Sequence, residues 1–327
     1  MIKKEKPFVG NFKEMLENFI KFKRNLGYKY VSAYYSLQKF SEYSLNYKSE
    51  DNSLSKELVI GWTTKKKDEA IKTWERRVSG LRQFALYLQS QGFDAFIPLK
   101  SCNALRSEYI PYIFTHEEIK CLFQVIDSIP PHPLSNKNES YPLLFRLLYC
   151  CGLRISEAIN LKINDVNFDS AVLLIRESKF NKDRLVPMSE SLADMFVKYQ
   201  ALFNVNKSPE DYYFRNKNDT CLTYGWVYKV FRKLLWKARI SHRGRGKGPR
   251  LHDIRHSFCV HTLAEQVKKG VDMYITLPIL SAYIGHNSVE ATQRYVRLTA
   301  EAFPELIEKI SRTCAYVIPE VTKNETN

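Results

Sequence analysis

The stretch from residue 251 to 295 constrains most strongly what this chain can be, because it combines histidines, an arginine and a tyrosine at spacings suited to a phosphate. It opens with LHDIRH at 251–256. His252 and Arg255 are three residues apart, so in a helix their side chains rise from one face and can converge on one anion. Such a short motif is also typical of a solvated helix face, so its meaning depends on the rest of the chain.

The same stretch ends with a second group of polar residues. Gly285 precedes His286 and indicates a helix end or turn, and Tyr295 follows nine residues after His286. Tyr295 is one of 20 tyrosines, most of which are expected to be packing residues with a wet hydroxyl. Its place after the Gly-His pair marks it as the candidate for chemistry.

An arginine follows an apolar segment further upstream. Residues 141–150 are apolar on nearly all sides, which predicts a buried helix, and the run GLRISE at 152–157 comes directly after it. Arg154 can form a structural ion pair with Glu157, or it can bind a phosphate while Glu157 keeps its planar guanidinium aimed.

A basic hairpin is predicted next. Residues 171–176 and 184–187 have strand composition, and KFNKD at 179–183 supplies the turn. Lys179, Lys182 and Arg184 are explained equally well as exposed turn charges.

The order of these pieces resembles the tyrosine recombinase (phage integrase) family over roughly residues 114–296. The family signature is an arginine in a Gly-Leu-Arg-x-x-Glu turn, a hairpin lysine, His-x-x-Arg, Gly-His, and a tyrosine about nine residues later. The chain departs from it at Ile254, where leucine is usual, and in the long segment 267–278, which puts loop geometry in doubt. The resemblance implies a catalytic set of Arg154, Lys179, His252, Arg255, His286 and the nucleophile Tyr295, with Glu157 in support. Lys182 is the second choice for the catalytic lysine.

The resemblance implies a mainly α fold with a small β-hairpin or sheet, arranged as a two-lobed DNA clamp. Apolar periodicity predicts helices at 11–27, 31–47, 56–63 and 68–91, which would form a helical domain over 1–100, and the resemblance implies that this domain binds DNA. A linker is predicted at 101–112 and a catalytic domain at 113–327, with a helix-capping pair at Thr115 and Glu118 and helices at 189–203 and 223–239.

Charge points to a polyanionic partner. The chain has 50 Lys plus Arg against 35 Asp plus Glu, a formal charge of +15, which alone does not separate DNA from RNA or an acidic membrane. No Asp or Glu occurs between Thr220 and His252, so a loop along a phosphate backbone is expected there, a solvated surface loop being the alternative. The candidate DNA contacts are Lys72, Arg76, Arg77, Arg82, Lys182, Arg184, Arg243, Arg245, Lys247 and Arg250.

Seven scattered cysteines without paired spacing predict a reducing, cytoplasmic setting, and no apolar run is long enough to span a membrane. No carboxylate cluster for a two-metal nuclease and no phosphate-binding loop for ATP is evident, so no cofactor is expected. With its target activated by the surrounding cations, Tyr295 would form a 3′-phosphotyrosine, Lys179 being the candidate acid and His252 the candidate base.

The sequence therefore predicts a site-specific DNA recombinase or integrase for integration, excision or transposition of a mobile element. A Xer-like resolvase of chromosomes or plasmids is the alternative, and a non-catalytic DNA-binding regulator is a further one from another class. A type IB topoisomerase uses similar chemistry, but the separate N-terminal domain argues against it. The expected partner is double-stranded DNA held by a homotetramer, with a short helix at 304–312 either exchanged between protomers or packed on its own domain.

Overall fold

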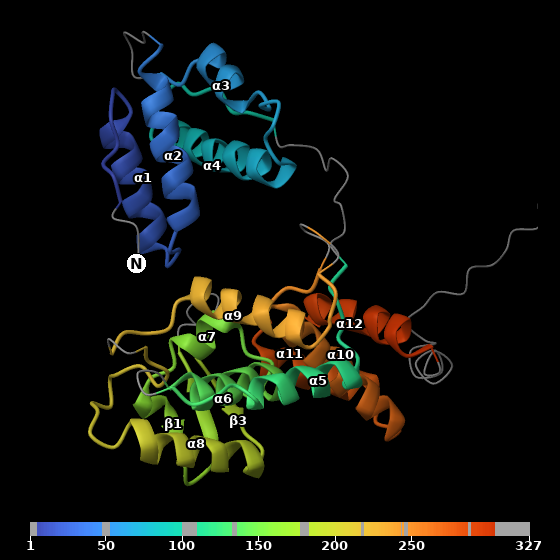
Figure 1. Cartoon of the computed structure of the whole chain (residues 1–327). Helices are drawn as coiled ribbons and strands as arrows, with labels where there is room; N and C mark the ends of the chain where they lie inside the picture. The colour runs from blue at the N-terminus through green and yellow to red at the C-terminus, as the bar shows by residue number, and fades with distance from the viewer. Residues whose placement is uncertain are drawn as a thin grey trace, which may run out of the picture. The chain divides into compact units, whose positions relative to one another are not determined.

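The computed structural model describes residues 5–47, 53–99, 110–132, 136–176, 183–216, 219–242, 244, 248–286 and 289–304 (Figure 1). The chain divides into two compact units, Met1–Glu108 and Tyr109–Asn327. Most of the predicted linker lies outside the described residues. Within the part of the chain that is described, no helix combines the length and apolarity needed to cross a membrane.

The first unit is a helical bundle, as the apolar periodicity predicts. Its helices are α1 (Lys13–Asn25), α2 (Val31–Ser44), α3 (Lys56–Thr63) and α4 (Ile71–Ser90). Phe84 of α4 lies at the centre of an aromatic core, with its ring centroid 5.5 Å from that of Phe19 and 6.3 Å from that of Phe12. All three rings are fully or nearly fully buried, so the helices are held together by their apolar faces.

The second unit is mainly helical around a small sheet. Its helices are α5 (His116–Asp127), α6 (Lys137–Cys150), α7 (Ile155–Ile159), α8 (Glu190–Phe203), α9 (Tyr224–Lys237), α10 (Asp253–Lys268), α11 (Met273–Ile284) and α12 (Val289–Ala302), with a 3₁₀ turn at Ile163–Asp165. The capping pair at the start of α5 is confirmed: Thr115 Oγ1 accepts from Glu118 N at 3.1 Å, and Thr115 N donates to the Glu118 carboxylate at 2.9 Å.

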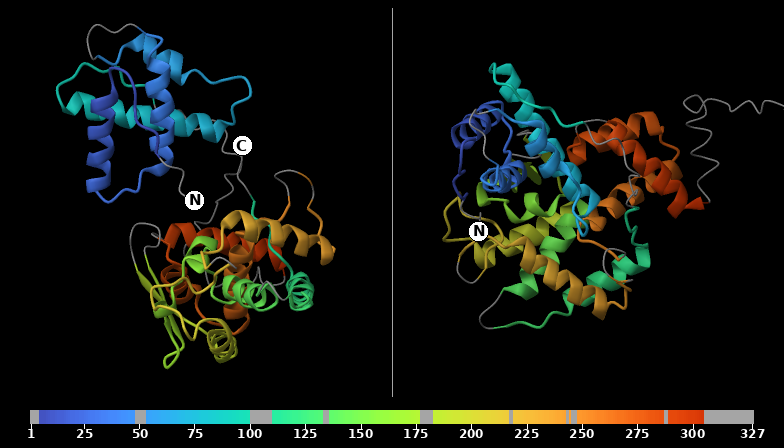
Figure 2. Two further views of the ribbon diagram at one scale, coloured as in Figure 1. Left: turned by 60° about the vertical axis from the view of Figure 1, so that its left-hand side comes forward. Right: turned by 90° about the horizontal axis from the view of Figure 1, so that it is seen from above.

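The sheet has three antiparallel strands, β1 (Val166–Asn167), β2 (Val172–Ile175) and β3 (Arg184–Pro187), in that order. The predicted hairpin is β2–β3, and β1 is an additional two-residue strand that pairs with β2. Figure 2 shows the strands at the edge of this unit. The β2–β3 turn, residues 177–182, lies outside the described residues.

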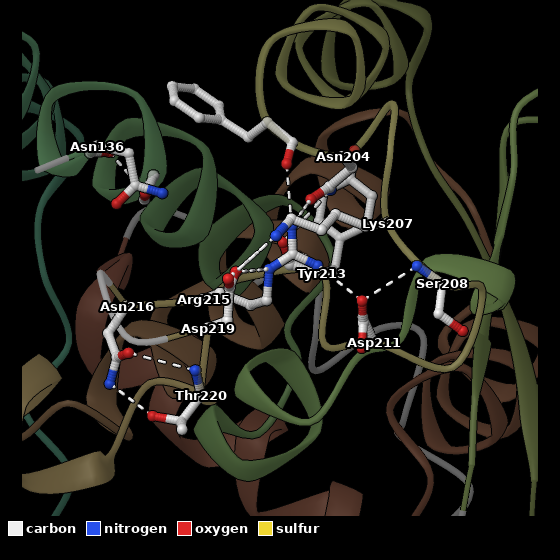
Figure 3. Close-up of polar contacts among 12 residues, drawn as sticks. Asn136, Asn204, Lys207, Ser208, Asp211, Tyr213, Arg215, Asn216, Asp219 and Thr220 are labelled. Carbon is white, nitrogen blue, oxygen red and sulfur yellow. Dashed lines mark hydrogen bonds and ion pairs between the residues drawn. The ribbon is translucent and has the colours of Figure 1, made fainter.

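A buried arginine ties down the segment that joins α8 to α9. Arg215 is 6% exposed and donates to Phe203 O at 2.9 Å and to Asn204 Oδ1 at 2.8 Å (Figure 3). Asp219 neutralises its charge at 3.2 Å. The network pairs a buried cation with a carboxylate and fixes this long connection against α8.

Candidate active site

Arg154 lies at the start of α7 and connects three segments of the second unit. Its Nη1 donates to Glu157 Oε1 at 2.7 Å, and its Nη2 donates to the main-chain oxygen of Gly285 at 3.0 Å. Its backbone N–H donates to Glu157 Oε2 at 2.9 Å. The side chain keeps about a fifth of its surface exposed. The ion pair and the phosphate-binding interpretation are therefore compatible, because Glu157 holds the guanidinium while part of it stays open.

Glu157 is shared with a second arginine, Arg184 of β3. The two guanidinium nitrogens of Arg184 lie 3.1 and 2.8 Å from the two carboxylate oxygens, and its Nε donates to Tyr283 O at 2.9 Å. Burial alone would raise the pKa of Glu157, but the hydrogen bonds and charge of Arg184, followed by the contacts of Arg154, lower it to about 2. The carboxylate is therefore ionised at neutral pH.

The predicted role of Arg184 as a DNA contact needs correction. Its side chain is 10% exposed, and its guanidinium is engaged by Glu157 and a main-chain oxygen. Arg184 of β3 instead binds Glu157, the carboxylate that also holds Arg154, and the main-chain oxygen of Tyr283 near the end of α11.

Arg255 of α10 is almost fully buried and faces the turn that follows α6 and the end of α11. Its Nη1 donates to Gly152 O and its Nη2 to Ile284 O, both at 2.6 Å. Burial, followed by the positive charge of Arg154, lowers its pKa to about 10. Two arginines whose charges destabilise each other form a natural site for an anion.

Gly152 allows α10 to approach this closely. It adopts a left-handed φ of +57°, and an added Cβ would lie 2.3 Å from Phe258 Cδ1 of α10. A side chain at this position would therefore push away the helix that carries Arg255.

Two predicted histidines border the arginines. His252 immediately precedes α10, and His286 follows Gly285, which ends α11 with a left-handed φ of +68°. His286 Nδ1 lies 3.0 Å from Thr292 Oγ1 of α12. Burial and then the charge of Arg255 lower the pKa of both imidazoles to about 4, so both are neutral at neutral pH and retain one N–H to donate.

Tyr295 of α12 is 2% exposed, and its ring lies parallel to that of His286 with centroids 6.0 Å apart. Its hydroxyl lies 2.9 Å from His256 Nδ1. Burial is the main cause that raises the pKa of Tyr295 above its ordinary value. The sequence prediction does not include His256, although it directly follows Arg255 in the motif that carries the prediction.

The remaining predicted residues differ in their surroundings. Lys179, Lys182, Arg243, Arg245 and Lys247 lie outside the described residues. Lys72, Arg76 and Arg250 are exposed. Arg82 is half-buried and donates to Pro98 O.

Arg77 is not available to DNA in this structure. It is 8% exposed, and its Nε and Nη2 donate to Glu69 at 2.9 and 2.6 Å. Its position on α4, next to the buried Val78, directs its side chain toward the interior of the first unit. Among the described residues, no group of three or more His, Cys, Asp or Glu side chains is placed to hold a metal ion.

The fold and this arginine–histidine–tyrosine arrangement define a class of DNA strand-transfer proteins, and comparison with known sequences supports it. The model of the phage integrase family matches residues 113–302. A protein of Sinorhizobium fredii named as an integrase/recombinase is 30% identical over 310 residues, covering 93% of this chain and 98% of that protein. Tyrosine recombinase XerA of Pyrococcus furiosus is 31% identical over 267 residues, covering 78% and 84%. The chain belongs to the phage integrase family, the tyrosine recombinases.

Solved structures support the fold. A Tn1549 transposon integrase in complex with transposon right end DNA matches with a TM-score of 0.62 at 18% identity, covering 90% of this chain and 98% of that one. A XerH site-specific recombinase bound to its difH substrate matches with a TM-score of 0.61 at 21% identity, covering 84% and 78%.

Proposed function

We propose that this tyrosine recombinase cleaves and rejoins DNA through a 3′-phosphotyrosine on Tyr295, for integration and excision or transposition of a mobile element. The observation that carries the proposal is the placement of Arg154, Arg255, His252, His286 and Tyr295 in one site. Three contacts support it: Arg154 donates to Gly285 O at 3.0 Å and Arg255 to Ile284 O at 2.6 Å, both just before His286 in the chain, whose ring lies 6.0 Å from that of Tyr295.

The chemistry follows from the charges in this site. Arg154 and Arg255 neutralise the non-bridging oxygens of the scissile phosphate, whose negative charge grows as the tyrosine attacks. The neutral imidazoles of His252 and His286 donate hydrogen bonds to the same oxygens. Glu157 and Arg184 hold Arg154 in place. Lys179 protonates the departing 5′-oxygen.

The reaction needs neither a metal ion nor ATP in this proposal. The two guanidinium groups take the part of a metal in stabilising charge, and the phosphotyrosine link conserves the energy of the phosphodiester. A 5′-hydroxyl from another strand then attacks the link and completes the exchange. Covalent attachment to DNA is accordingly expected in EDTA and without nucleotide.

A Xer-like resolvase remains the second candidate, and the similarity to XerA favours it. The two candidates differ in where they cut. An integrase or transposase cuts at the ends of the element that carries its gene, whereas a resolvase cuts at a fixed site in the chromosome or plasmid.

The test is to map covalent protein–DNA adducts in the host, on the DNA flanking the gene and across the chromosome. Adducts at two inverted or direct repeats flanking the gene would support the mobile-element function. Adducts at one chromosomal site would favour the resolvase. Absence of any adduct in cells that express the folded protein would contradict the strand-transfer proposal.

We also propose that four copies act together on DNA, with the segment after Phe303 exchanged between neighbours. A solved lambda integrase structure that matches this chain with a TM-score of 0.60 at 15% identity is a tetramer bound to a Holliday junction. The segment follows α12, the helix that carries Tyr295, so its docking can alter the position of the tyrosine. The alternative is that the segment packs on its own unit.

A further inference from the structure

Tyr295 and His256 meet between two packed helices. His256 lies one turn into α10 and Tyr295 lies in the middle of α12, and both belong to the second unit. His256 Nδ1 is 2.9 Å from the tyrosine hydroxyl oxygen, a normal hydrogen-bond distance. The tyrosine backbone is fixed as well, because its carbonyl accepts from Thr299 Oγ1 at 2.7 Å. The hydroxyl that would attack the phosphate therefore already has an imidazole nitrogen as a hydrogen-bond partner.

We propose that His256 is a catalytic residue that accepts the hydroxyl proton of Tyr295 as the tyrosine attacks the phosphodiester. This inference rests on the proposed function and adds a residue to it. It gives His256 the role of base that the sequence suggests for His252, and His252 keeps its role in binding the phosphate.

The step balances in atoms and charge. The Tyr295 oxygen forms a bond to phosphorus, its proton moves to His256 Nδ1, and the bond from phosphorus to the 5′-oxygen breaks. The departing 5′-oxygen takes a proton from the acid of the proposed function, Lys179. In the reverse step a 5′-hydroxyl attacks and gives its proton to Lys179, and the tyrosine oxygen leaves with the proton returned by His256.

The surroundings of His256 favour the acceptor state. The groups that face it are His252 and Arg255 from its own helix, Tyr295 and Arg294 from α12, and His286 from the turn after α11, while Cys259 contacts Tyr295. Burial, followed by repulsion from His252 and from the charge of Arg255, lowers the pKa of His256 to about 3. The imidazole is neutral at neutral pH, and a proton on Nε2 leaves the Nδ1 lone pair directed at the hydroxyl.

These surroundings would also keep the tyrosine unreactive in the absence of DNA. Burial raises the pKa of Tyr295, and the nearby arginines disfavour a charged His256, so proton transfer is opposed from both sides. A phosphodiester bound beside Arg255 supplies the negative charge that this transfer requires. Activation of the tyrosine is thereby coupled to occupancy of the site.

The test compares His256→Asn with a matched control on the same helix. Asparagine can accept a hydrogen bond near the position of Nδ1 but cannot take up the proton. His261 is the control, because its Nδ1 lies 2.8 Å from the Tyr149 hydroxyl in an equivalent tyrosine–histidine pair away from Arg154 and Arg255. Both variants are first checked for folding by thermal unfolding and for affinity to DNA.

The readout is the single-turnover rate of covalent adduct formation, on a nicked duplex that carries the cleavage site mapped for the wild-type protein. His256→Asn is expected to bind this duplex normally and to form the adduct about 100-fold more slowly at neutral pH. Its rate should rise with pH, because hydroxide must remove the proton, whereas the wild-type rate should be flat. His261→Asn should retain the wild-type rate and pH profile.

Three outcomes would overturn the assignment: a wild-type rate and pH profile in His256→Asn, a faster rate, or a loss of DNA affinity that accounts for the slower rate. A faster rate would show that the hydrogen bond restrains the tyrosine.

If the variant does not fold, ¹⁵N spectra of the wild-type protein test the proposal through the protonation of His256 Nδ1. An unprotonated Nδ1 whose signal shifts in Tyr295→Phe supports the proposal, and a protonated Nδ1 contradicts it.

Failure of this inference is distinct from failure of the proposed function. If Tyr295→Phe abolishes the adduct and His256→Asn does not slow it, strand transfer stands and the base lies elsewhere. If the wild-type protein forms no adduct on any mapped or candidate DNA, both fall.

Discussion

Arg184 and Arg77 show that the role of a basic residue depends on what its guanidinium meets. The sequence shows both as positive charges in basic segments, which predicts contact with DNA. In the structure each is turned inward and paired with a carboxylate, Arg184 with Glu157 and Arg77 with Glu69. Charge counts predict the partner of the whole molecule, but they do not predict which charges are used within the fold.

Replacing Arg184 with lysine tests its role as a support for Arg154. Lysine keeps the charge but cannot span both oxygens of Glu157 while also reaching Tyr283 O. DNA affinity should be unchanged, and the single-turnover rate of adduct formation should fall by about 10-fold to 100-fold, because small displacements of catalytic groups are costly. A reduced affinity with an unchanged rate would instead make Arg184 a DNA contact.

The adjacent pair Arg76 and Arg77 separates a surface charge from a structural one. Arg77→Ala removes the arginine partner of the half-buried Glu69, so the free energy of unfolding of the first unit should fall by about 1 to 3 kcal/mol. Arg76→Ala should leave it unchanged, because Arg76 is exposed, and should weaken DNA binding. Chemical denaturation and a DNA titration of both variants check this. Equal stability of the two variants would be inconsistent with a structural role for Arg77.

At the scale of elements, most helices follow from apolar periodicity. The predicted helix at 56–63 agrees with α3, and the strand at 184–187 agrees with β3. The two-residue strand β1 has too few residues to show a pattern. The sequence does not predict the start of α11 within residues 267–278, since the segment lacks a clear period and Pro278 lies inside the helix.

The sequence predicts most of the residues of the candidate site but not His256. The motifs locate Arg154, Arg255, His286 and Tyr295, because their order along the chain resembles a family pattern. His256 could not be assigned a role from its spacing, since its partner is 39 residues away and the packing of α10 on α12 creates the contact.

Substitutions at two glycines test whether the close approach of α10 to the turn after α6 requires a residue without a side chain. Gly152→Ala and Gly270→Ala both place a side chain at a positive φ, at +57° and +75°, so both should lose about 1 kcal/mol of stability. At Gly152 the new Cβ also meets Phe258, which should add about 1 to 3 kcal/mol and slow adduct formation. At Gly270 nothing lies within 4 Å. Equal losses, measured by denaturation, would show that α10 can retreat without cost.

At the scale of the whole molecule, the proposed exchange of the terminal segment would link cleavage to assembly. Phe303 packs on His261 of its own unit, with ring centroids 6.0 Å apart, so a truncation that starts at residue 305 spares this contact. Truncation is expected to leave binding to a single site intact and to impair the pairing of sites and recombination. Gel-shift and recombination assays on the same DNA measure both. Undiminished recombination would rule out exchange of the segment between protomers.

The central claim is that Tyr295 is the nucleophile of a strand-transfer site. Tyr149→Phe is a suitable control, because Tyr149 also pairs with a histidine of α10, outside the site. The measurement is the covalent protein–DNA adduct on a denaturing gel, with wild type, Tyr295→Phe and Tyr149→Phe on the same mapped duplex. If Tyr295 is the nucleophile, we expect an adduct in wild type and Tyr149→Phe and none in Tyr295→Phe, with equal DNA affinity in all three. An adduct that persists in Tyr295→Phe would contradict it and move the nucleophile elsewhere, with Tyr283 the nearest alternative.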